Sequence, residues 1–412
     1  MRYVWQNTNW AEFTWNTDAL VQPLGRARRC QGGVLSKMDA LGLKFSSEAQ
    51  AEILIEETVK TAAIEGQTLH RDSVRSSVAR RLGLPTAGLP TGDRIADGLV
   101  DVLMDATVNY DKPLTAERLM AWQAALFPTG YSGLRKIRAG RWRGLEAMQV
   151  VSGPMGREKV HLEAPPAERV DKEIRNFLRW WEKGSKNIEG LLRAAIAHFR
   201  FVTIHPFEDG NGRIARALTD MALAQDEKLG SRFYSLSTRI MAERDGYYRV
   251  LERCQKGDGD ITGWLVWFLE CFERAVEHSE ILISTVLTKA RFWQQHGQTL
   301  LNERQRKVVN RLLDAGPDGF EGGLTTRKYV SMAKVSRATA FRTSYGRTRN
   351  KPLSSLNLPF APLRETNISK SRLPCCVVFQ HWTMPTWKLF RLWKKNLARR
   401  CCLFHTMILT RQ

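Results

Sequence analysis

One twelve-residue stretch between two helical runs constrains this chain more than any other feature. It extends from His205 to Arg216 and reads HPFEDGNGRIAR. Apolar residues recur at helical spacing before it, in 188–202, and after it, in 214–224. The pattern therefore predicts a mainly helical domain in which a short loop leads directly into the N-terminus of a helix.

The residues of this loop suit a bound anion such as a polyphosphate. The first N–H groups of a helix lack partners, and the helix dipole is positive at that end. Gly210 and Gly212 allow the backbone to approach an anion without an intervening Cβ. Arg213 and Arg216 lie three positions apart and so share one face of the first helical turn. Their charge opposes the dipole, which a bound polyphosphate would explain.

Two further residues of the stretch suggest chemistry beside that anion. Asp209 offers the hard oxygen ligand that Mg²⁺ prefers. His205 titrates near neutral pH and can take a proton from a hydroxyl group. Each residue taken alone also fits an ordinary helix–loop–helix corner with solvated side chains, whereas the whole set favours a phosphate-handling site.

The stretch matches the pattern H-x-F-x-D/E-G-N-G-R-x-x-R at every fixed position and so resembles the active-site motif of the Fic family. The resemblance implies transfer of AMP from ATP, with Mg²⁺, to a Ser, Thr or Tyr hydroxyl of a protein. It also implies a role for each motif residue: His205 as general base, Phe207 as anchor of the loop, Asp209 as magnesium ligand, Gly210, Asn211 and Gly212 as the anion cradle, and Arg213 and Arg216 as ligands of the β- and γ-phosphates.

Two tyrosines downstream, Tyr247 and Tyr248, stand where the family contacts the adenine. Packing in the core is the alternative, and it is expected to hold for one of the two. The cradle itself recognises phosphates better than bases, so another nucleotide donor also fits the motif.

A helix predicted over 47–66 carries a second resemblance. Ser47 and Gln50 form a capping-box pattern at its start, and Gly66 is a candidate C-cap. Near its end Thr61 and Glu65 face one way, as in the inhibitory helix of the family. The resemblance implies that Glu65 pairs with Arg216, takes the γ-phosphate position and misaligns the α-phosphate for attack.

Glu65 leaves two alternatives open. The first is an ordinary amphipathic helix with an exposed glutamate. The second is a glutamate that positions water to remove AMP from a modified protein, so that the same site acts as a deAMPylase.

A change of period over 149–162 predicts a β-hairpin within the helical chain. In position it resembles the Fic flap, which docks the target segment along its edge. The alternative is a hairpin with no role in binding. Lys159 and His161 on this segment are not expected to be catalytic.

The sequence predicts an all-α protein in four parts. Residues 1–85 form an N-terminal helical module that includes the inhibitory helix 47–66, and 86–285 form the Fic domain. Residues 1 to about 45 resemble the helical domain that accompanies some Fic proteins, and a small helical module that packs its aromatics into a core is the alternative. Residues 295–345 resemble a winged helix-turn-helix, in which 324–342, with Arg337 and Arg342, would contact DNA. A protein-interaction module fits that segment comparably, and a DNA-binding regulator with a vestigial Fic site is the rival from another functional class.

The last part, 346–412, is predicted to be a basic tail that is disordered or non-native. From Thr343 onward the chain holds 13 Lys or Arg and one acid, which gives +12 of the total charge of +21. The lack of periodicity suggests a changed coding frame near Thr343, and a membrane-surface tail is the functional rival.

Composition limits the setting of the protein. No apolar run reaches the roughly 18 residues that span a membrane, and the first residues show no signal-peptide pattern. The 7 cysteines form no disulfide framework. These features predict a cytoplasmic protein with no membrane partner. The target protein and the oligomeric state, a homo-oligomer included, stay open.

Overall fold

The computed structural model describes residues 3–39, 43–86, 89–152, 159–314 and 324–345. The chain divides into two units, Met1–Arg364 and Glu365–Gln412. The second unit and the predicted tail 346–412 lie outside the described residues, so the fold below concerns the first unit alone.

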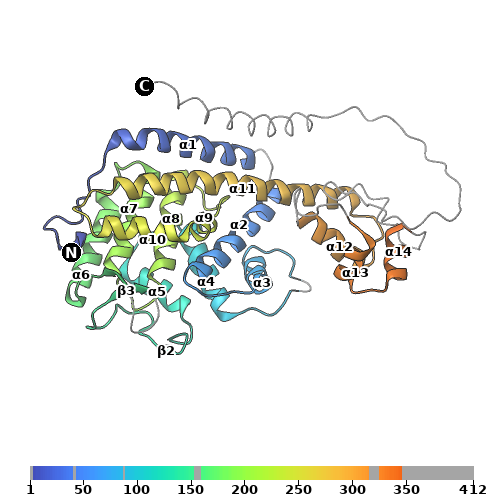
Figure 1. The fold of residues 1–412 in the computed structure, drawn as a ribbon, viewed down its shortest axis with the longest axis horizontal. Coiled ribbons are helices and arrows are strands. Elements are labelled where there is room, and N and C mark those ends of the chain that lie inside the picture. Colours follow the sequence, from blue (N-terminus) through green and yellow to red (C-terminus); the bar gives the residue numbers. More distant parts are fainter. Residues whose placement is uncertain (1–2, 40–42, 87–88, 153–158, 315–323, 346–412) are drawn as a thin grey trace, which may run out of the picture. The chain divides into compact units, whose positions relative to one another are not determined.

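The described part of the chain is almost entirely helical, as predicted (Figure 1). The strands of this part form two small antiparallel hairpins: β1 (Tyr131–Ser132) pairs with β2 (Arg135–Lys136), and β3 (Gln149–Ser152) pairs with β4 (Lys159–Glu163). The helices within unit 1 are η1 (Val4–Gln6), α1 (Thr17–Asp39), α2 (Leu43–Ile64), α3 (Arg71–Arg81), α4 (Arg94–Val108), α5 (Ala116–Leu126), α6 (Ala167–Arg179), the π-helical turn η2 (Trp180–Gly184), α7 (Gly190–Ile204), α8 (Asn211–Glu227), α9 (Leu236–Ala242), α10 (Arg244–Gln255), α11 (Thr262–His296), α12 (Glu303–Asp314), α13 (Thr326–Ala333) and α14 (Arg337–Tyr345).

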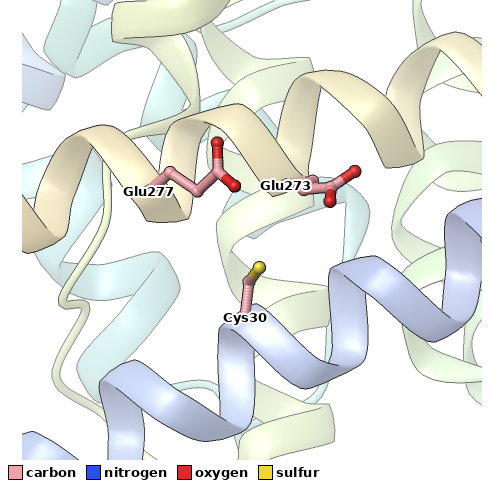
Figure 2. Close-up of side chains that lie close together, drawn as sticks. All are labelled: Cys30, Glu273 and Glu277. Atoms are coloured by element: carbon pink, nitrogen blue, oxygen red, sulfur yellow. The ribbon is translucent and has the colours of Figure 1, made fainter. Parts of the chain in front are cut away.

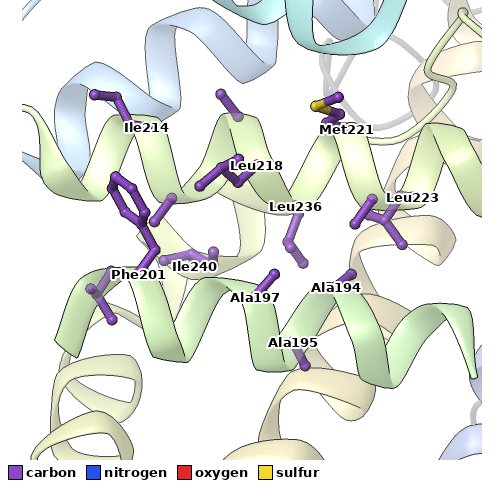
Figure 3. Packing of buried hydrophobic residues seen from close by; sticks show 14 of the residues in the cluster. Ala194, Ala195, Ala197, Phe201, Ile214, Leu218, Met221, Leu223, Leu236 and Ile240 are labelled. Carbon is purple, nitrogen blue, oxygen red and sulfur yellow. The ribbon is translucent and has the colours of Figure 1, made fainter. Parts of the chain in front are cut away.

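Helices α7 and α8 form the centre of the core. Figure 3 shows Phe201 of α7 pointing toward Ile214 and Leu218 of α8, with Leu236 and Ile240 of α9 beside them. All five side chains are buried. Burial of each large apolar side chain contributes about 1.5–3 kcal/mol, so this packing fixes the ends of α7 and α8 between which the motif loop runs.

The same core includes the N-terminal residues. Trp5 and Trp10 are buried, and the indole N–H of Trp10 donates to Glu173 Oε2 of α6 at 3.1 Å. Helix α1 packs along α11. Figure 2 shows Cys30 of α1 facing Glu273 and Glu277 of α11. Burial, followed by these carboxylates, raises the pKa of the Cys30 thiol.

Helix α11 continues well beyond the apolar residues of its first half. It runs to His296, and no glycine or proline lies between Val276 and Gly297 to interrupt it. Its second half carries Phe292 to a separate small core. That core joins α11 to the three helices that follow.

Helices α12, α13 and α14 occupy the positions predicted for a helix-turn-helix. Val308, Leu312, Tyr329 and Ala340 are buried together with Phe292. Lys334, with a φ of 49°, ends α13 in the left-handed region. Arg337 and Arg342 of α14 are exposed. A wing after Tyr345 would lie outside the described residues, and DNA binding stays a prediction.

The structure corrects two helix boundaries. Helix α2 begins at Leu43, so Ser47 lies inside the helix and does not cap it. It ends at Ile64, two residues before the candidate C-cap Gly66, which takes a φ of 77°. Helix α6 passes directly into η2, whose wider turn continues to Gly184. The tip of the flap hairpin, 153–158, lies outside the described residues.

No helix in the described ranges combines the length and the apolar character needed to cross a bilayer.

Candidate active site

The motif loop begins where α7 ends. His205 caps α7 in the left-handed region, with φ 51° and ψ 58°, a conformation that costs a non-glycine residue about 1–2 kcal/mol. Two residues later Phe207 is fully buried, its ring centroid 4.8 Å from that of Trp142. As expected, the phenylalanine anchors the loop in the core.

Asn211 closes the loop on itself. Its Oδ1 accepts from the Phe207 N–H at 3.0 Å, and its Nδ2 donates to the Phe207 carbonyl at 2.8 Å. The side chain is buried and engaged in these bonds. Asn211 can therefore contribute to an anion cradle through its backbone N–H at the start of α8, whereas its amide shapes the loop.

The hydrogen bonds of His205 define its tautomer. Nδ1 lies 3.1 Å from the Val202 carbonyl, which can only accept, so Nδ1 carries the hydrogen and Nε2 of the neutral ring carries the lone pair. Burial lowers the pKa of His205, and the nearby charge of Arg143 acts in the same direction. The ring is therefore neutral, with a basic Nε2, at physiological pH.

Arg143 holds the backbone around His205. Its Nε donates to the His205 carbonyl at 2.9 Å, its backbone N–H donates to the Pro206 carbonyl at 2.9 Å, and its Nη2 donates to Pro165. The side chain is buried. These bonds stabilise the left-handed conformation at His205, and they come from a residue that the sequence did not single out.

The N-terminus of α8 has the features of an anion cradle. Gly210 has a φ of 92°, and a Cβ there would lie 3.1 Å from the ring of Phe127. Arg213 Nη1 donates to Gln67 Oε1 at 3.1 Å. Within the described residues, Arg213 Nε and Arg216 Nη1 are buried without hydrogen-bond partners. Unpaired buried donors are costly, and phosphate oxygens would satisfy these two.

Thr61 of α2 and Glu65, directly after the end of α2, are the partners of Arg216. Its Nε donates to Thr61 Oγ1 at 2.5 Å, and its Nη2 donates to the Thr61 carbonyl at 3.1 Å and to Glu65 Oε1 at 2.7 Å. Burial alone would lower the pKa of Arg216, but the Glu65 carboxylate outweighs it and the pKa is raised. The pair that the resemblance implied is thus present in the structure.

The Glu65 carboxylate also lies against the cradle. A Cβ added to Gly212 would overlap Glu65 Oε1. Glycine at this position leaves the space that the carboxylate fills at the positive end of α8. An anion is therefore already present where a bound phosphate would be favoured.

Asp209 fits the donor chemistry of a magnesium ligand. Its carboxylate is partly exposed and accepts from Ser132 Oγ and, at 2.5 Å, from the Gly210 N–H. Mg²⁺ is commonly held by one or two carboxylates together with substrate phosphates and water. One carboxylate beside an anion cradle satisfies that requirement.

The two tyrosines of α10 differ. Tyr247 is buried, and its hydroxyl lies 2.8 Å from His198 Nε2 in the core. Tyr248 is half-buried, and the Arg244 guanidinium lies 5.3 Å from its ring centroid. The packing alternative therefore suits Tyr247, whereas adenine contact stays a prediction that Tyr248 fits better.

The flap hairpin is attached to α10 through Glu252. Its carboxylate lies 2.6 Å from His161 Nδ1, 3.2 Å from Lys159 Nζ and 2.7 Å from Lys256 Nζ. Burial opposes ionisation of Glu252, but donation from Lys256, His161 and Lys159 lowers its pKa to about 2. Lys159 and His161 therefore position the hairpin.

Sequence reasoning missed Arg143, Gln67, Ser132 and Glu252. Gln67 directly follows the predicted C-cap Gly66, so proximity to Glu65 was a usable signal. Ser132 lies 77 positions before its partner Asp209, and Arg143 lies 62 positions before its partner His205. Glu252 lies 91 positions after His161. Such long-range pairs leave no local pattern.

A helical domain in which a loop and a helix N-terminus carry this motif defines a Fic-type protein. The Fic/DOC family model matches residues 113–223, and a domain of unknown function (DUF4172) matches residues 3–84. Residues 113–223 of the chain are therefore similar to the Fic/DOC family, and they include the whole motif 205–216.

Curated relatives share modest identity with the chain. It is 23% identical over 267 residues to the protein adenylyltransferase Fic of Nematostella vectensis. The aligned region covers 62% of this chain and 57% of the relative. It is 33% identical over 96 residues to a probable protein adenylyltransferase of Aquifex aeolicus (strain VF5), covering 23% and 30%. The chain thus spans less than two thirds of the length of either relative.

Similar solved structures include a Fic family protein from Desulfovibrio desulfuricans G20, with a TM-score of 0.49, 23% identity, and coverage of 79% of this chain and 87% of that one. A Fic domain containing signaling protein from Bacteroides thetaiotaomicron VPI-5482 has a TM-score of 0.47 and 16% identity, and covers 63% of this chain and 98% of that one.

Proposed function

We propose that this protein is a protein adenylyltransferase that moves AMP from ATP to a Ser, Thr or Tyr hydroxyl of another protein. The observation that carries the proposal is the junction of α7 and α8. There the basic Nε2 of His205 and the unpartnered donors of Arg213 and Arg216 belong to one loop and one helical turn. The names of the relatives from Nematostella vectensis and Aquifex aeolicus support the same activity.

In the proposed reaction a target hydroxyl gives its proton to His205 Nε2 while its oxygen attacks the α-phosphorus of ATP. The bond from that phosphorus to the bridging oxygen breaks, and pyrophosphate leaves. Phosphoryl-type transfer depends mainly on alignment and on neutralisation of charge. Arg213, Arg216 and the N–H groups of α8 would align the phosphates and neutralise their charge. Mg²⁺, held by Asp209, would neutralise phosphate charge when bound.

We further propose that Glu65 holds the enzyme in an inactive state. Its carboxylate neutralises Arg216 and lies in the space over Gly212. A γ-phosphate would compete with it for the same guanidinium, so ATP would bind with its α-phosphate out of line with the hydroxyl. Removal of this carboxylate is expected to free the guanidinium for the nucleotide.

Intact-mass analysis tests the activity directly. Glu65→Gly protein is incubated with ATP and Mg²⁺ beside the Glu65→Gly/His205→Ala double variant, and automodification is measured. We expect an added mass of one AMP in the single variant alone. If neither variant gains mass although calorimetry shows that ATP binds, automodification by this site is excluded. If both variants gain one AMP to the same extent, His205 is not the base.

The target is proposed to dock along the hairpin 149–162, and the cytoplasm stays the expected compartment. DNA binding through 324–342 is not part of this proposal.

A further inference from the structure

A cavity of about 830 Å³ lies beside the motif loop, on residues outside the anion cradle. The segment that joins β2 to β3 forms most of its wall, and Glu208 of the motif contributes the rest. Its charged lining residues are Arg135, Lys136, Arg138, Arg143, Glu146 and Glu208. Four basic side chains against two acidic ones make the cavity electropositive, which favours an anionic occupant.

One wall residue points to a specific ligand class. Arg143 is 5% exposed, and its Nη1 is buried with no hydrogen-bond partner among the described residues. An unpaired guanidinium N–H in a low-dielectric position costs stability, which an anionic oxygen would recover. Arg135, Lys136 and Arg138 are exposed at the same cavity and would steer such an anion inward.

The cavity is continuous with the predicted docking hairpin. Gln149, the first residue of β3, lines it. The opposite strand, β4, has carbonyls that accept from side chains, since Trp5 Nε1 donates to Glu163 and Lys256 Nζ donates to Val160. An extended segment would therefore add to the β3 edge, and its side chains would reach the cavity.

The cavity is also coupled to the reacting group. Arg143 lines it and donates to the His205 carbonyl. Exposed Leu145 at its wall offers apolar contact to the same segment. A polypeptide that fills the cavity thus lies next to the loop that carries the base.

We propose that this cavity receives a carboxylate side chain of the target protein, so that the substrates are extended, acidic segments bearing a hydroxyl residue. The proposal rests on the proposed transferase function and specifies its substrate class. The acidic side chain contacts Arg138 and Arg143, while the segment pairs with β3 and brings its hydroxyl toward His205.

Peptide binding tests this surface without any need for catalysis. The full chain, with Glu65 intact and without ATP, is titrated into a fluorescent peptide in which aspartates and glutamates flank a single serine. The matched probe carries asparagines and glutamines instead. Fluorescence anisotropy is measured for the wild type, for Arg138→Glu, and for Arg175→Glu. Arg175 is an exposed arginine of α6 outside the cavity, so the last variant makes the same charge change elsewhere.

We expect the wild type and Arg175→Glu to prefer the acidic peptide, and Arg138→Glu to lose about tenfold in affinity for that peptide alone. Lys136→Glu should weaken binding in the same direction. No acidic preference in the wild type would overturn the proposal. An equal loss in Arg175→Glu would overturn it too, because the net charge of +21 would then explain the preference.

Two further outcomes separate this inference from the proposed function. If Glu65→Gly protein transfers AMP equally to both peptides, the docking surface is wrong and the activity stands. If the acidic peptide binds through Arg138 but receives no AMP, the surface stands and the activity is wrong. If one ATP per chain displaces the one bound peptide, the cavity binds the nucleotide and the inference is overturned.

Discussion

The Glu65 carboxylate accepts a hydrogen bond from Arg216 Nη2 at 2.7 Å, across 151 positions of the chain. The guanidinium is nearly inaccessible to solvent, whereas the carboxylate is 28% exposed. A buried charge that loses its partner is destabilised by several kcal/mol unless another anion replaces it. Competition between this carboxylate and a nucleotide phosphate is the basis of the proposed regulation.

Charge and volume at Glu65 can be separated by two substitutions. Glu65→Gln keeps the side chain over Gly212 but no longer neutralises Arg216, while Glu65→Gly removes both effects. We expect transfer rates to rise in the order wild type, Glu65→Gln, Glu65→Gly, with at least about a tenfold gain for the glycine variant, which corresponds to 1.4 kcal/mol. Labelling with an alkynyl ATP analogue measures this. Equal rates for all three proteins would remove the autoinhibition proposal.

Arg143 should act on the position of His205 and not on the nucleotide. Arg143→Met removes the bonds to the His205 and Pro165 carbonyls. In the Glu65→Gly background we expect transfer to fall about 100-fold, since a small displacement of a reacting group has that effect, with ATP affinity nearly unchanged. Single-turnover rates and calorimetry measure the two quantities.

The control for that experiment is Arg141→Met, which alters an exposed arginine two positions away. It should leave rate and affinity alone. If Arg143→Met weakens ATP binding as strongly as it slows transfer, the guanidinium contacts the nucleotide and the positioning role is wrong.

The pH dependence of transfer should follow the neutral form of His205. Its pKa is lowered, first by burial, so the basic form persists below the usual histidine value of about 6.5. We expect kcat/KM of Glu65→Gly protein to stay level through neutral pH and to fall only at more acidic values. A half-maximum above that usual value would contradict the lowered pKa.

Acid stability should depend on a second histidine. His198 is fully buried between Thr219 Oγ1 and Tyr247 Oη, and burial lowers its pKa to about 3. The unfolded chain binds this proton near pH 6.5 and the native protein only near pH 3, so stability falls as pH decreases through that window.

We expect His198 to contribute a loss of a few kcal/mol in the free energy of unfolding across that range. Urea unfolding of the wild type and of His198→Gln at several pH values measures it. The variant should be less stable at neutral pH and less sensitive to acid. A parallel pH profile in both proteins would show that His198 is not the group responsible.

Glu252 should control how the flap presents a target. Glu252→Gln weakens its bonds to Lys159, His161 and Lys256. Because two of these partners are partly exposed, we expect a few-fold rise in KM for the protein target, with KM for ATP unchanged. Asp245→Asn, an exposed position on the same helix, is the control. A change in both KM values would indicate a general disturbance of α10.

Local sequence patterns predicted the elements that surround the site but not all of their lengths. The loop between α7 and α8, Gly66 after α2 and the hairpin of β3 and β4 follow from residue spacing and from glycine placement. The start of α2 does not, because helix propagation continues through residues that find a buried neighbour.

The sequence by itself determined the chemistry at the junction: an imidazole, a carboxylate, two glycines and two guanidinium groups within one loop and one turn, where contacts are set by local geometry. Only the tertiary structure decided what surrounds them. Arg143 reaches the His205 carbonyl, Glu65 fills the space over Gly212, and Glu252 holds the flap. Those pairs form because distant helices bury their apolar faces against one core, and the resulting register, which no local pattern encodes, brings the polar side chains together.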